Sequence, residues 1–178
     1  RTDILVSADG GETWEVREGP ADIFGDSVWS LAVDPQDANV LYTYVEGDFF
    51  NGPCKSTNGG RSWTVLFLLG GCNCIYFVGW FVIDPNNSNV VYLLTAGGVY
   101  KSLDAGVSWK NLGLAGSSAL AIVSSNSDIL YAGTRNGGVF KSTDGGESWD
   151  AFKDGLTNLN INALAIDDSG THLYAGTE

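Results

Sequence analysis

The sequence has no methionine, a single histidine and only four prolines among its 178 residues. It also lacks any apolar run near the roughly 20 residues that a membrane-spanning helix needs, so we expect no membrane insertion. Positively charged residues are scarce. The chain has 9 Lys and Arg and 21 Asp and Glu, and its formal net charge is −12. That excess of negative charge repels phosphate backbones, and we therefore expect no nucleic-acid partner.

Helical apolar spacing is also largely missing, whereas glycines and aromatic residues are plentiful. The chain contains 24 Gly and 12% aromatic residues, with 44% hydrophobic residues overall. This composition is typical of many short strands joined by turns, and it allows a single domain with a real core.

One octet with the pattern Ser-x-Asp-x-Gly-x-x-Trp occurs four times, with Asn replacing Asp in the second copy. The shared residues are Ser7, Asp9, Gly11 and Trp14; Ser56, Asn58, Gly60 and Trp63; Ser102, Asp104, Gly106 and Trp109; and Ser142, Asp144, Gly146 and Trp149. A similar segment that recurs at intervals of 40 to 49 residues is the mark of a solenoid or a propeller.

The octet chemistry favours a structural role over a catalytic one. Asp and Asn side chains accept hydrogen bonds from backbone N–H groups one or two residues on, and Gly supplies the positive φ of a tight turn. Asn58 keeps the acceptor and loses the charge, which a catalytic acid could not do. We therefore expect the acids to close turns between strands and the tryptophans to seal the space between neighbouring sheets.

These octets resemble the Asp-box, or BNR repeat, of sialidases, sortilin-type receptors, xyloglucan hydrolases and photosystem assembly factors. A second shared segment accompanies each octet, and the four copies are Val33-Asp34-Pro35 to Tyr42, Ile83-Asp84-Pro85 to Tyr92, Val123 to Tyr131, and Ile166-Asp167 to Tyr174. The resemblance implies an all-β propeller of four-stranded antiparallel blades. It does not identify the function, because the family includes enzymes, receptors and assembly factors.

We expect one propeller domain over residues 1–178. The predicted blades are 28–67, 78–112 and 118–152, with a further blade that combines 160–178 and 1–17. Such sharing would close the ring and remove two exposed sheet edges. Two alternatives also agree with chain ends that fall at matching positions of the repeat. The chain is then part of a longer propeller of six to ten blades, or one unit of an assembly of copies.

Three cysteines leave a pairing question open. A bridge from Cys54 to Cys72 or Cys74 would close a loop of about 20 residues and contribute on the order of 3 kcal/mol. It would indicate a location outside a reducing cytosol and leave one thiol over. Three reduced thiols are the alternative. We expect no metal site, since Cys-x-Cys has no second ligand pair beside the lone His172.

A ligand site is expected on the face formed by the outer-to-inner loops and the loops between second and third strands. Carboxylates and aromatic residues gather there in the first two blades, and the candidates are Asp22, Phe24, Asp26, Asp48, Phe49, Phe50 and Tyr76. This combination suits a sugar-binding groove, and it is also what ordinary acidic loops contain. Separately, Asn86-Asn87-Ser88 is a candidate N-glycosylation sequon at Asn86.

The catalytic patterns of the resembling enzymes are not assembled in this sequence. Sialidases of this type use three arginines, but Arg61, one of only four arginines here, falls inside an Asp-box turn. Hydrolysis by two carboxylates needs an opposed pair about 5 to 10 Å apart, and Asp26 and Asp48 could be nominated. We assign no catalytic residue and expect no cofactor.

The sequence therefore favours a non-enzymatic, extracellular or periplasmic binding or assembly module. Its partner is expected to be another protein or further copies of itself. The alternative is a glycan-active protein, either a carbohydrate-binding propeller or a fragment of an Asp-box glycoside hydrolase.

Overall fold

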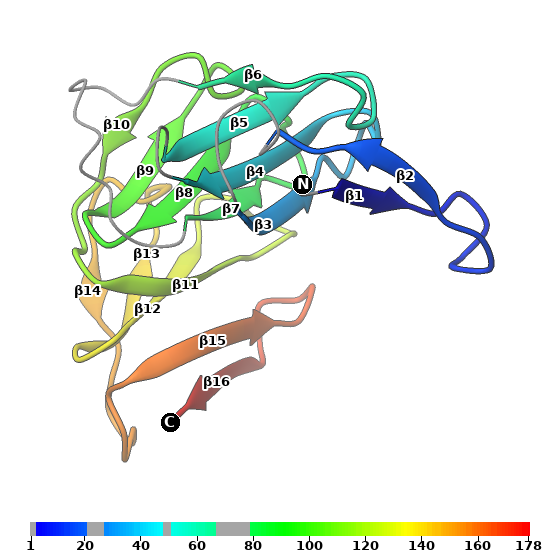
Figure 1. Cartoon of the computed structure of the whole chain (residues 1–178). Helices are drawn as coiled ribbons and strands as arrows, with labels where there is room; N and C mark the ends of the chain where they lie inside the picture. The colour runs from blue at the N-terminus through cyan, green and yellow to red at the C-terminus, as the bar shows by residue number, and fades with distance from the viewer. Residues whose placement is uncertain (1–2, 21–26, 48–50, 67–78) are drawn as a thin grey trace. The chain divides into compact units, whose positions relative to one another are not determined.

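The computed structural model describes residues 3–20, 27–47, 51–66 and 79–178 of the chain (Figure 1). In these ranges all the extended regular structure is β-strand, and no helix is long and apolar enough to cross a membrane. The all-β prediction is confirmed. The chain divides into two compact units, Arg1–Phe81 and Val82–Glu178.

Sixteen strands follow one another along the described parts of the chain. They are β1 (Asp3–Val6), β2 (Glu15–Glu18), β3 (Ser27–Val33), β4 (Leu41–Glu46), β5 (Gly52–Ser56), β6 (Thr64–Val65), β7 (Trp80–Ile83), β8 (Val91–Thr95), β9 (Gly98–Ser102), β10 (Lys110–Asn111), β11 (Ser117–Ile122), β12 (Leu130–Thr134), β13 (Gly138–Ser142), β14 (Asp150–Ala151), β15 (Ile161–Ile166) and β16 (Leu173–Thr177).

Three four-stranded antiparallel sheets account for most of the strands. Their orders are β3-β4-β5-β6, β7-β8-β9-β10 and β11-β12-β13-β14, so neighbours in the chain are neighbours in each sheet. Two hairpins, β1-β2 and β15-β16, form separate two-stranded sheets. The predicted union of these hairpins in one blade, and with it the closed ring, stays a prediction.

The fourth strand of each full sheet is shorter than the sequence predicts. The pattern predicts a strand over 109–112, but β10 spans only Lys110–Asn111. Two more backbone bonds follow, from Leu112 N to Val99 O and from Val99 N to Gly113 O, and Gly113 then turns the chain away with φ 80°. Trp109, the first residue of the predicted strand, lies before the residues that pair in the sheet. Its side chain packs in the core, and its backbone is not part of the strand.

Apolar side chains of adjacent sheets form the core. In Val82–Glu178 a cluster combines Tyr92, Leu94 and Val99 of one sheet with Leu120 and Leu130 of the next. These side chains are almost fully buried, and each such burial contributes roughly 1.5–3 kcal/mol. The core therefore lies between sheets stacked face to face, as in a stack of blades.

Close approach of β15 to the preceding sheet depends on Gly133 of β12. A Cβ at this position would lie 2.5 Å from Cγ2 of the fully buried Ile161. Gly176 is the corresponding residue of β16, and a Cβ there would meet nothing nearer than Ala163 at 3.5 Å.

We predict that Gly133→Ala destabilises the protein by about 1–3 kcal/mol, because the added methyl group overpacks the contact with Ile161. Gly176→Ala serves as the matched control and should change the free energy of unfolding by less than about 0.5 kcal/mol. Urea unfolding of both variants measures the difference. Equal effects of the two substitutions would contradict the packing argument.

Candidate functional site

Each Asp-box octet forms a turn held by a serine and an acid. In the fourth octet, Ser142 Oγ donates to Asp144 Oδ1 (2.7 Å) and accepts from the backbone N–H groups of Asp144 (3.3 Å) and Gly146 (2.8 Å). Asp144 Oδ1 also accepts from Ser148 N (2.9 Å), while Ser148 Oγ donates to Oδ2 (2.6 Å). The first and third octets repeat these bonds.

The geometry corrects one detail of the sequence interpretation. The carboxylate accepts a backbone bond from the residue four positions on, and the serine hydroxyl accepts backbone bonds from the residues two and four positions after it. The hydroxyl residue before each tryptophan is therefore part of the turn, although the motif left it unspecified. A signal for it was present, since the position is Thr13, Ser62, Ser108 or Ser148 in the four octets.

Hydrogen bonds keep the turn acids ionised. The Ser108 hydroxyl and N–H lower the pKa of Asp104 to about 2, and those of Ser148 do the same for Asp144. The pKa of Asp9 is lowered as well, chiefly by the Thr13 hydroxyl. A general acid needs a raised pKa, so these carboxylates are unsuited to proton donation and suited to closing turns.

The second octet shows what an amide does in the same place. Asn58 Oδ1 accepts from Arg61 N (3.0 Å) and Ser62 N (2.9 Å), while its Nδ2 donates to Ser62 Oγ (2.8 Å). The turn is thus kept without the charge, because the serine hydroxyl reverses its role from donor to acceptor.

We predict that Asp144→Asn yields a folded protein whose stability no longer depends on this group's ionisation. An aspartate titrates near pH 3.9 when unfolded and at about 2 here, so its contribution is complete above about pH 4 and is lost as the pH falls through 2. Urea unfolding between pH 5 and 2 should show that the difference in the free energy of unfolding between wild type and variant becomes smaller as the pH falls. A constant difference would contradict the assignment.

The third octet has Ala105 where the other three have glycine. Ala105 adopts φ 56°, in the left-handed region that costs a non-glycine residue about 1–2 kcal/mol. The neighbouring hydrogen bonds hold it there, including Ala105 N to Asn89 O at 2.9 Å.

We predict that Ala105→Gly stabilises the protein by up to about 1 kcal/mol, because relief of the strain exceeds the added backbone entropy of glycine. The control is Ala151→Gly in β14, which has no positive φ to relieve and should destabilise by about 0.5–1 kcal/mol. Thermal or urea unfolding measures whether each substitution raises or lowers the free energy of unfolding. Destabilisation by both changes would refute the strain argument.

Packing of the four tryptophans differs along the chain. Trp63 and Trp109 are 8% and 2% exposed, and Trp149 packs against the cluster that joins two sheets. Trp63 likewise contacts a cluster that includes Ile4 of β1. Trp14, in contrast, is 59% exposed. Trp63 and Trp149 therefore pack in clusters that join neighbouring sheets, as predicted, and the role of Trp14 stays a prediction.

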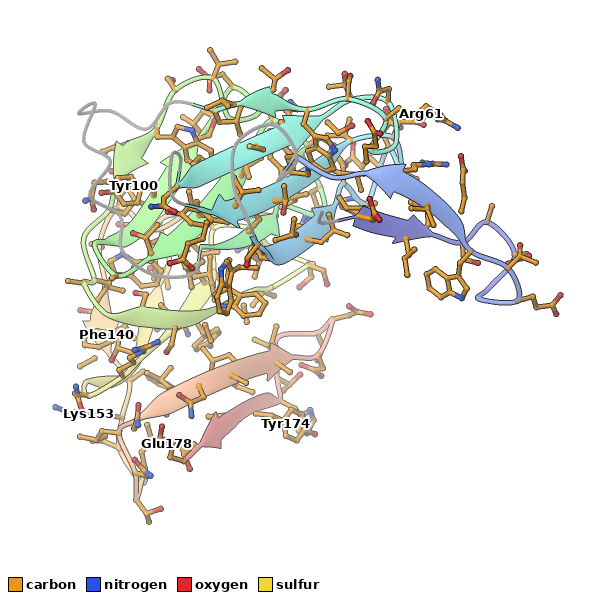
Figure 2. All side chains as sticks on the ribbon, viewed as in Figure 1. Arg61, Tyr100, Phe140, Lys153, Tyr174 and Glu178 are labelled. Carbon is orange, nitrogen blue, oxygen red and sulfur yellow. The ribbon has the colours of Figure 1, made fainter. Side chains whose placement is uncertain are left out.

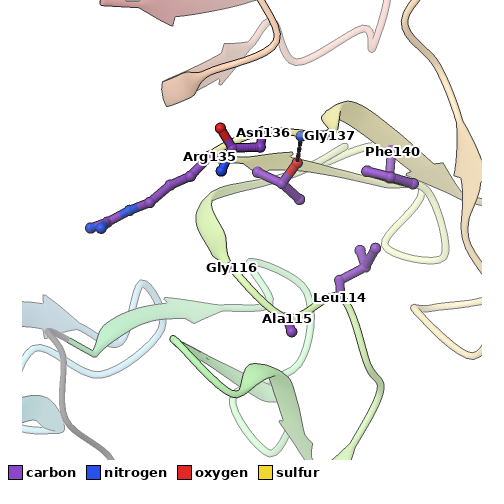
Figure 3. Close-up of a pocket in the computed structure, with 8 residues that line it drawn as sticks. Leu114, Ala115, Gly116, Arg135, Asn136, Gly137 and Phe140 are labelled. Atoms are coloured by element: carbon purple, nitrogen blue, oxygen red, sulfur yellow. Dashed lines mark hydrogen bonds between the residues drawn. The ribbon is translucent and has the colours of Figure 1, made fainter.

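A pocket lies at the other end of the sheet from the fourth Asp-box turn. In the β12–β13 ladder, Ser142 pairs with Leu130 at the turn end, and Gly138 pairs with Thr134 at the hairpin end. The pocket has a volume of about 190 Å³ and is lined by Leu114, Ala115, Gly116, Thr134, Arg135, Asn136, Gly137 and Phe140 (Figure 3). It belongs to the face on which a ligand was expected.

Backbone hydrogen bonds hold the two loops of this pocket in place. Gly116 N donates to Ala96 O and Gly116 O accepts from Arg135 N, both at 3.1 Å. Gly137 N donates to Thr134 Oγ1 at 2.9 Å (Figure 3). Leu114 adopts φ 54°, and strained residues of this kind cluster at functional sites. The pocket is therefore preformed.

The side chains around the pocket are of two kinds. Phe140 and Leu114 are partly buried and apolar, whereas Arg135 and Asn136 extend from the exposed tip of the hairpin (Figure 3). No carboxylate is among the residues that line it. The site can therefore take an apolar group and donate hydrogen bonds to its surroundings, but it holds no acid or base pair.

The seven residues nominated for the ligand face lie outside the described residues. They are Asp22, Phe24, Asp26, Asp48, Phe49, Phe50 and Tyr76, and their role stays a prediction. The sequence analysis nominated loops of the same class as those of this pocket, but in the first two blades. The signal for this pocket was weak, since short loops such as Arg135-Asn136-Gly137-Gly138 carry no acid or exposed aromatic residue.

Cys54 and Asn86 have defined surroundings. Cys54 has no disulfide partner among the described residues and no exposed surface, and burial raises the pKa of its thiol to about 12. Its predicted partners Cys72 and Cys74 lie outside the described residues, so the bridge stays a prediction. Asn86 Nδ2, the atom that glycosylation would modify, donates to Ser124 O (2.7 Å) and Ser127 Oγ (3.0 Å). In the described ranges no three His, Cys, Asp or Glu residues are grouped for a metal ion.

Comparisons with known proteins agree with this architecture. A model of the DUF6242 β-propeller domain matches residues 84–171. The chain has the fold of β-propeller blades. Its predicted resemblance to the Asp-box propellers is confirmed, since a xyloglucanase of Hypocrea jecorina (strain QM6a) is 32% identical over 130 residues, which are 63% of this chain and 16% of that enzyme.

Two solved structures share the fold of this propeller at low identity. The extracellular domain of a one-component system from B. thetaiotaomicron has a TM-score of 0.71 and 15% identity, covering 98% of this chain and 24% of that one. YCF48 bound to D1 peptide has a TM-score of 0.62 and 14% identity, covering 98% and 55%. The propeller thus spans less than two thirds of each of these proteins.

Proposed function

We propose that this propeller is a non-enzymatic binding module that holds an extracytoplasmic protein partner at the pocket between Leu114–Gly116 and Thr134–Gly137. The observation that carries the proposal is the size and lining of this pocket. Sites for small molecules usually measure about 300–1,000 Å³, and this one measures about 190 Å³. A cavity of that size suits one anchoring side chain of a larger partner.

The surroundings of the pocket fit such a partner. The rim offers Arg135 and Asn136 as exposed hydrogen-bond donors, and Leu114 and Phe140 form an apolar floor. A buried apolar anchor inside a polar rim is the usual anatomy of a protein interface. YCF48, with the same fold, has been solved with a bound peptide, which supports a peptide-like ligand.

Hydrolysis is not favoured by the groups that the structure describes. The Asp-box acids have lowered pKa values and are used in turns, and the pocket lining contains no carboxylate. Arg17 and Arg61 donate to backbone carbonyls of the second turn and are not free to form an arginine cluster. Figure 2 shows the Arg61 side chain projecting from the surface.

Carbohydrate binding is the second candidate. The match to a xyloglucanase favours it, and the exposed loops of this face would then contact a glycan. A secreted or periplasmic location suits both candidates, and one fold relative is described as an extracellular domain.

The test uses a peptide library displayed on phage and selected on the wild-type propeller. Peptides that use the pocket should bind Ala115→Glu at least tenfold more weakly, because the larger charged side chain fills the cavity. The matched control is Thr143→Glu, an exposed position at the Asp-box end of the same sheet, which should leave binding unchanged. Arg135→Ala should have an intermediate effect.

A glycan array probed with the same variants separates the two candidates. The ligand would be a carbohydrate and not a protein if two results were found together. Ala115→Glu would abolish binding to the array, and the binding of the selected peptides would not depend on that substitution. Release of sugar from xyloglucan oligosaccharides would reject the non-enzymatic assignment.

A further inference from the structure

Three asparagines of this chain are followed directly by glycine, and they are Asn51, Asn58 and Asn136. An asparagine in this position can react with its own backbone, because the nitrogen of the next residue can attack the side-chain amide carbon and close a succinimide ring. Glycine favours the reaction, since it has no side chain to shield that nitrogen and its backbone is the most adaptable. The sequence alone therefore contains three candidate sites of deamidation.

Asn58 is held against this reaction on both sides of the bond that would form. Its Oδ1 accepts hydrogen bonds from Arg61 N and Ser62 N, and its Nδ2 donates to Ser62 Oγ at 2.8 Å. The attacking nitrogen would be that of Gly59, which is buried and donates to Asn39 O at 2.8 Å. Ring closure at Asn58 therefore requires the second Asp-box turn to open.

Asn51 is also fixed by its neighbours. Its Oδ1 accepts a hydrogen bond from Gly47 N at 2.9 Å. The following residue, Gly52, is buried and is the first residue of β5, where it is the register partner of Val45 in β4. The nitrogen that would attack therefore lies in a sheet and not in a loop.

Asn136 differs from both because nothing holds its side chain. It lies beside Arg135 at the exposed tip of the β12–β13 hairpin (Figure 3). Its amide group has no hydrogen-bond partner in the part of the chain that the structure describes. Gly137 is partly exposed, and its N–H donates to a side chain, Thr134 Oγ1. The reacting carbon and nitrogen can therefore meet after a movement confined to the loop.

Asn58 and Asn136 are a matched pair, because both are followed by two glycines. Their local chemistry is the same when the chain is unfolded, so a difference between them in the native protein comes from the fold. Opening the tip of an exposed loop needs little free energy, whereas opening a buried turn needs a larger part of the global free energy of unfolding. We therefore expect Asn136 to react faster than Asn58.

We propose that Asn136 is a deamidation site of this protein and that its conversion places a negative charge at the rim of the pocket. Gly137 N loses its proton to solvent base and bonds to Asn136 Cγ, while Nδ2 leaves as ammonia. Water then adds to one of the two carbonyl groups of the succinimide and opens the ring. Aspartate or isoaspartate remains at position 136, and solvent water is the one co-reactant.

The effect on the rim rests on the proposed function. The amide of Asn136 both donates and accepts hydrogen bonds, whereas a carboxylate accepts them and cannot donate. The new charge is next to Arg135 in the chain, so it attracts that guanidinium and competes with an acidic group of a partner. The isoaspartate product also lengthens the backbone of the loop. Conversion should therefore weaken a partner that uses the rim.

Peptide mapping by mass spectrometry tests the site. Native protein is incubated at alkaline pH, and trypsin then separates the three asparagines into fragments 18–55, 56–61 and 136–141. Relative to a sample without incubation, the mass gain of an amide-to-acid conversion should appear at least about ten times faster in 136–141 than in 56–61, because the two opening free energies differ.

Two controls make the mapping specific. Incubation in guanidinium chloride should give fragments 136–141 and 56–61 the same rate, because the fold no longer protects Asn58. Asn136→Gln should abolish the fast conversion, since a longer side chain closes the ring far less readily. A native Asn136 that converts no faster than Asn58 overturns the proposal.

The effect on the pocket is measured separately with Asn136→Asp, which imitates the aspartate product. Peptides that were selected on wild type and that lose binding to Ala115→Glu should bind this variant at least about threefold more weakly. Unchanged binding overturns the effect on the rim. If no selected peptide depends on the pocket, the effect on the rim fails with the proposed function, whereas the mapping result still decides whether Asn136 is the site.

Discussion

The structure depends on one local arrangement, a serine hydroxyl and a carboxylate that together bind the backbone of a glycine turn. Ser142 Oγ and Asp144 Oδ1 accept backbone N–H groups that would otherwise be unpaired, and the turn adopts positive φ at Gly145 and Gly146. This geometry presents the Gly145 carbonyl to the preceding sheet, where Lys101 and Tyr92 bind it. A local turn therefore determines how two sheets pack, and its repetition produces the propeller.

Much of the fold follows from the sequence because its determinants are local. The octet and its second shared segment set the turns, and the residues between them form short strands such as Gly52–Ser56 inside the predicted blade 28–67. The outer strands were overestimated for a physical reason. A tryptophan at the start of 109–112 has strong strand propensity, but its ring packs on the core and only Lys110–Asn111 pair in the ladder.

The candidate site was less accessible to sequence reasoning. The pocket depends on the left-handed conformation of Leu114 and on Gly116 joining two hairpins through Ala96 and Arg135, and neither feature has a residue signature. Acids and aromatic residues in the longer loops of 21–26 and 48–50 drew attention instead, because those residue types are the usual sign of a ligand. The hydroxyls of Ser108 and Ser148, in contrast, could have been found by comparing the four octets position by position.

The two ends of each sheet carry different constraints, and this difference decides where function can reside. At the Asp-box end, the acids are held as anions and their turns are used for contacts between sheets, so a substitution there changes stability. At the hairpin end, loops such as Thr134–Gly137 need only join two strands, and their side chains are free to vary. Propellers with the same turns can therefore differ in ligand. For this reason, the enzymatic activity of one relative is not assigned to this chain. We therefore propose recognition at the hairpin end and contacts between sheets at the turn end.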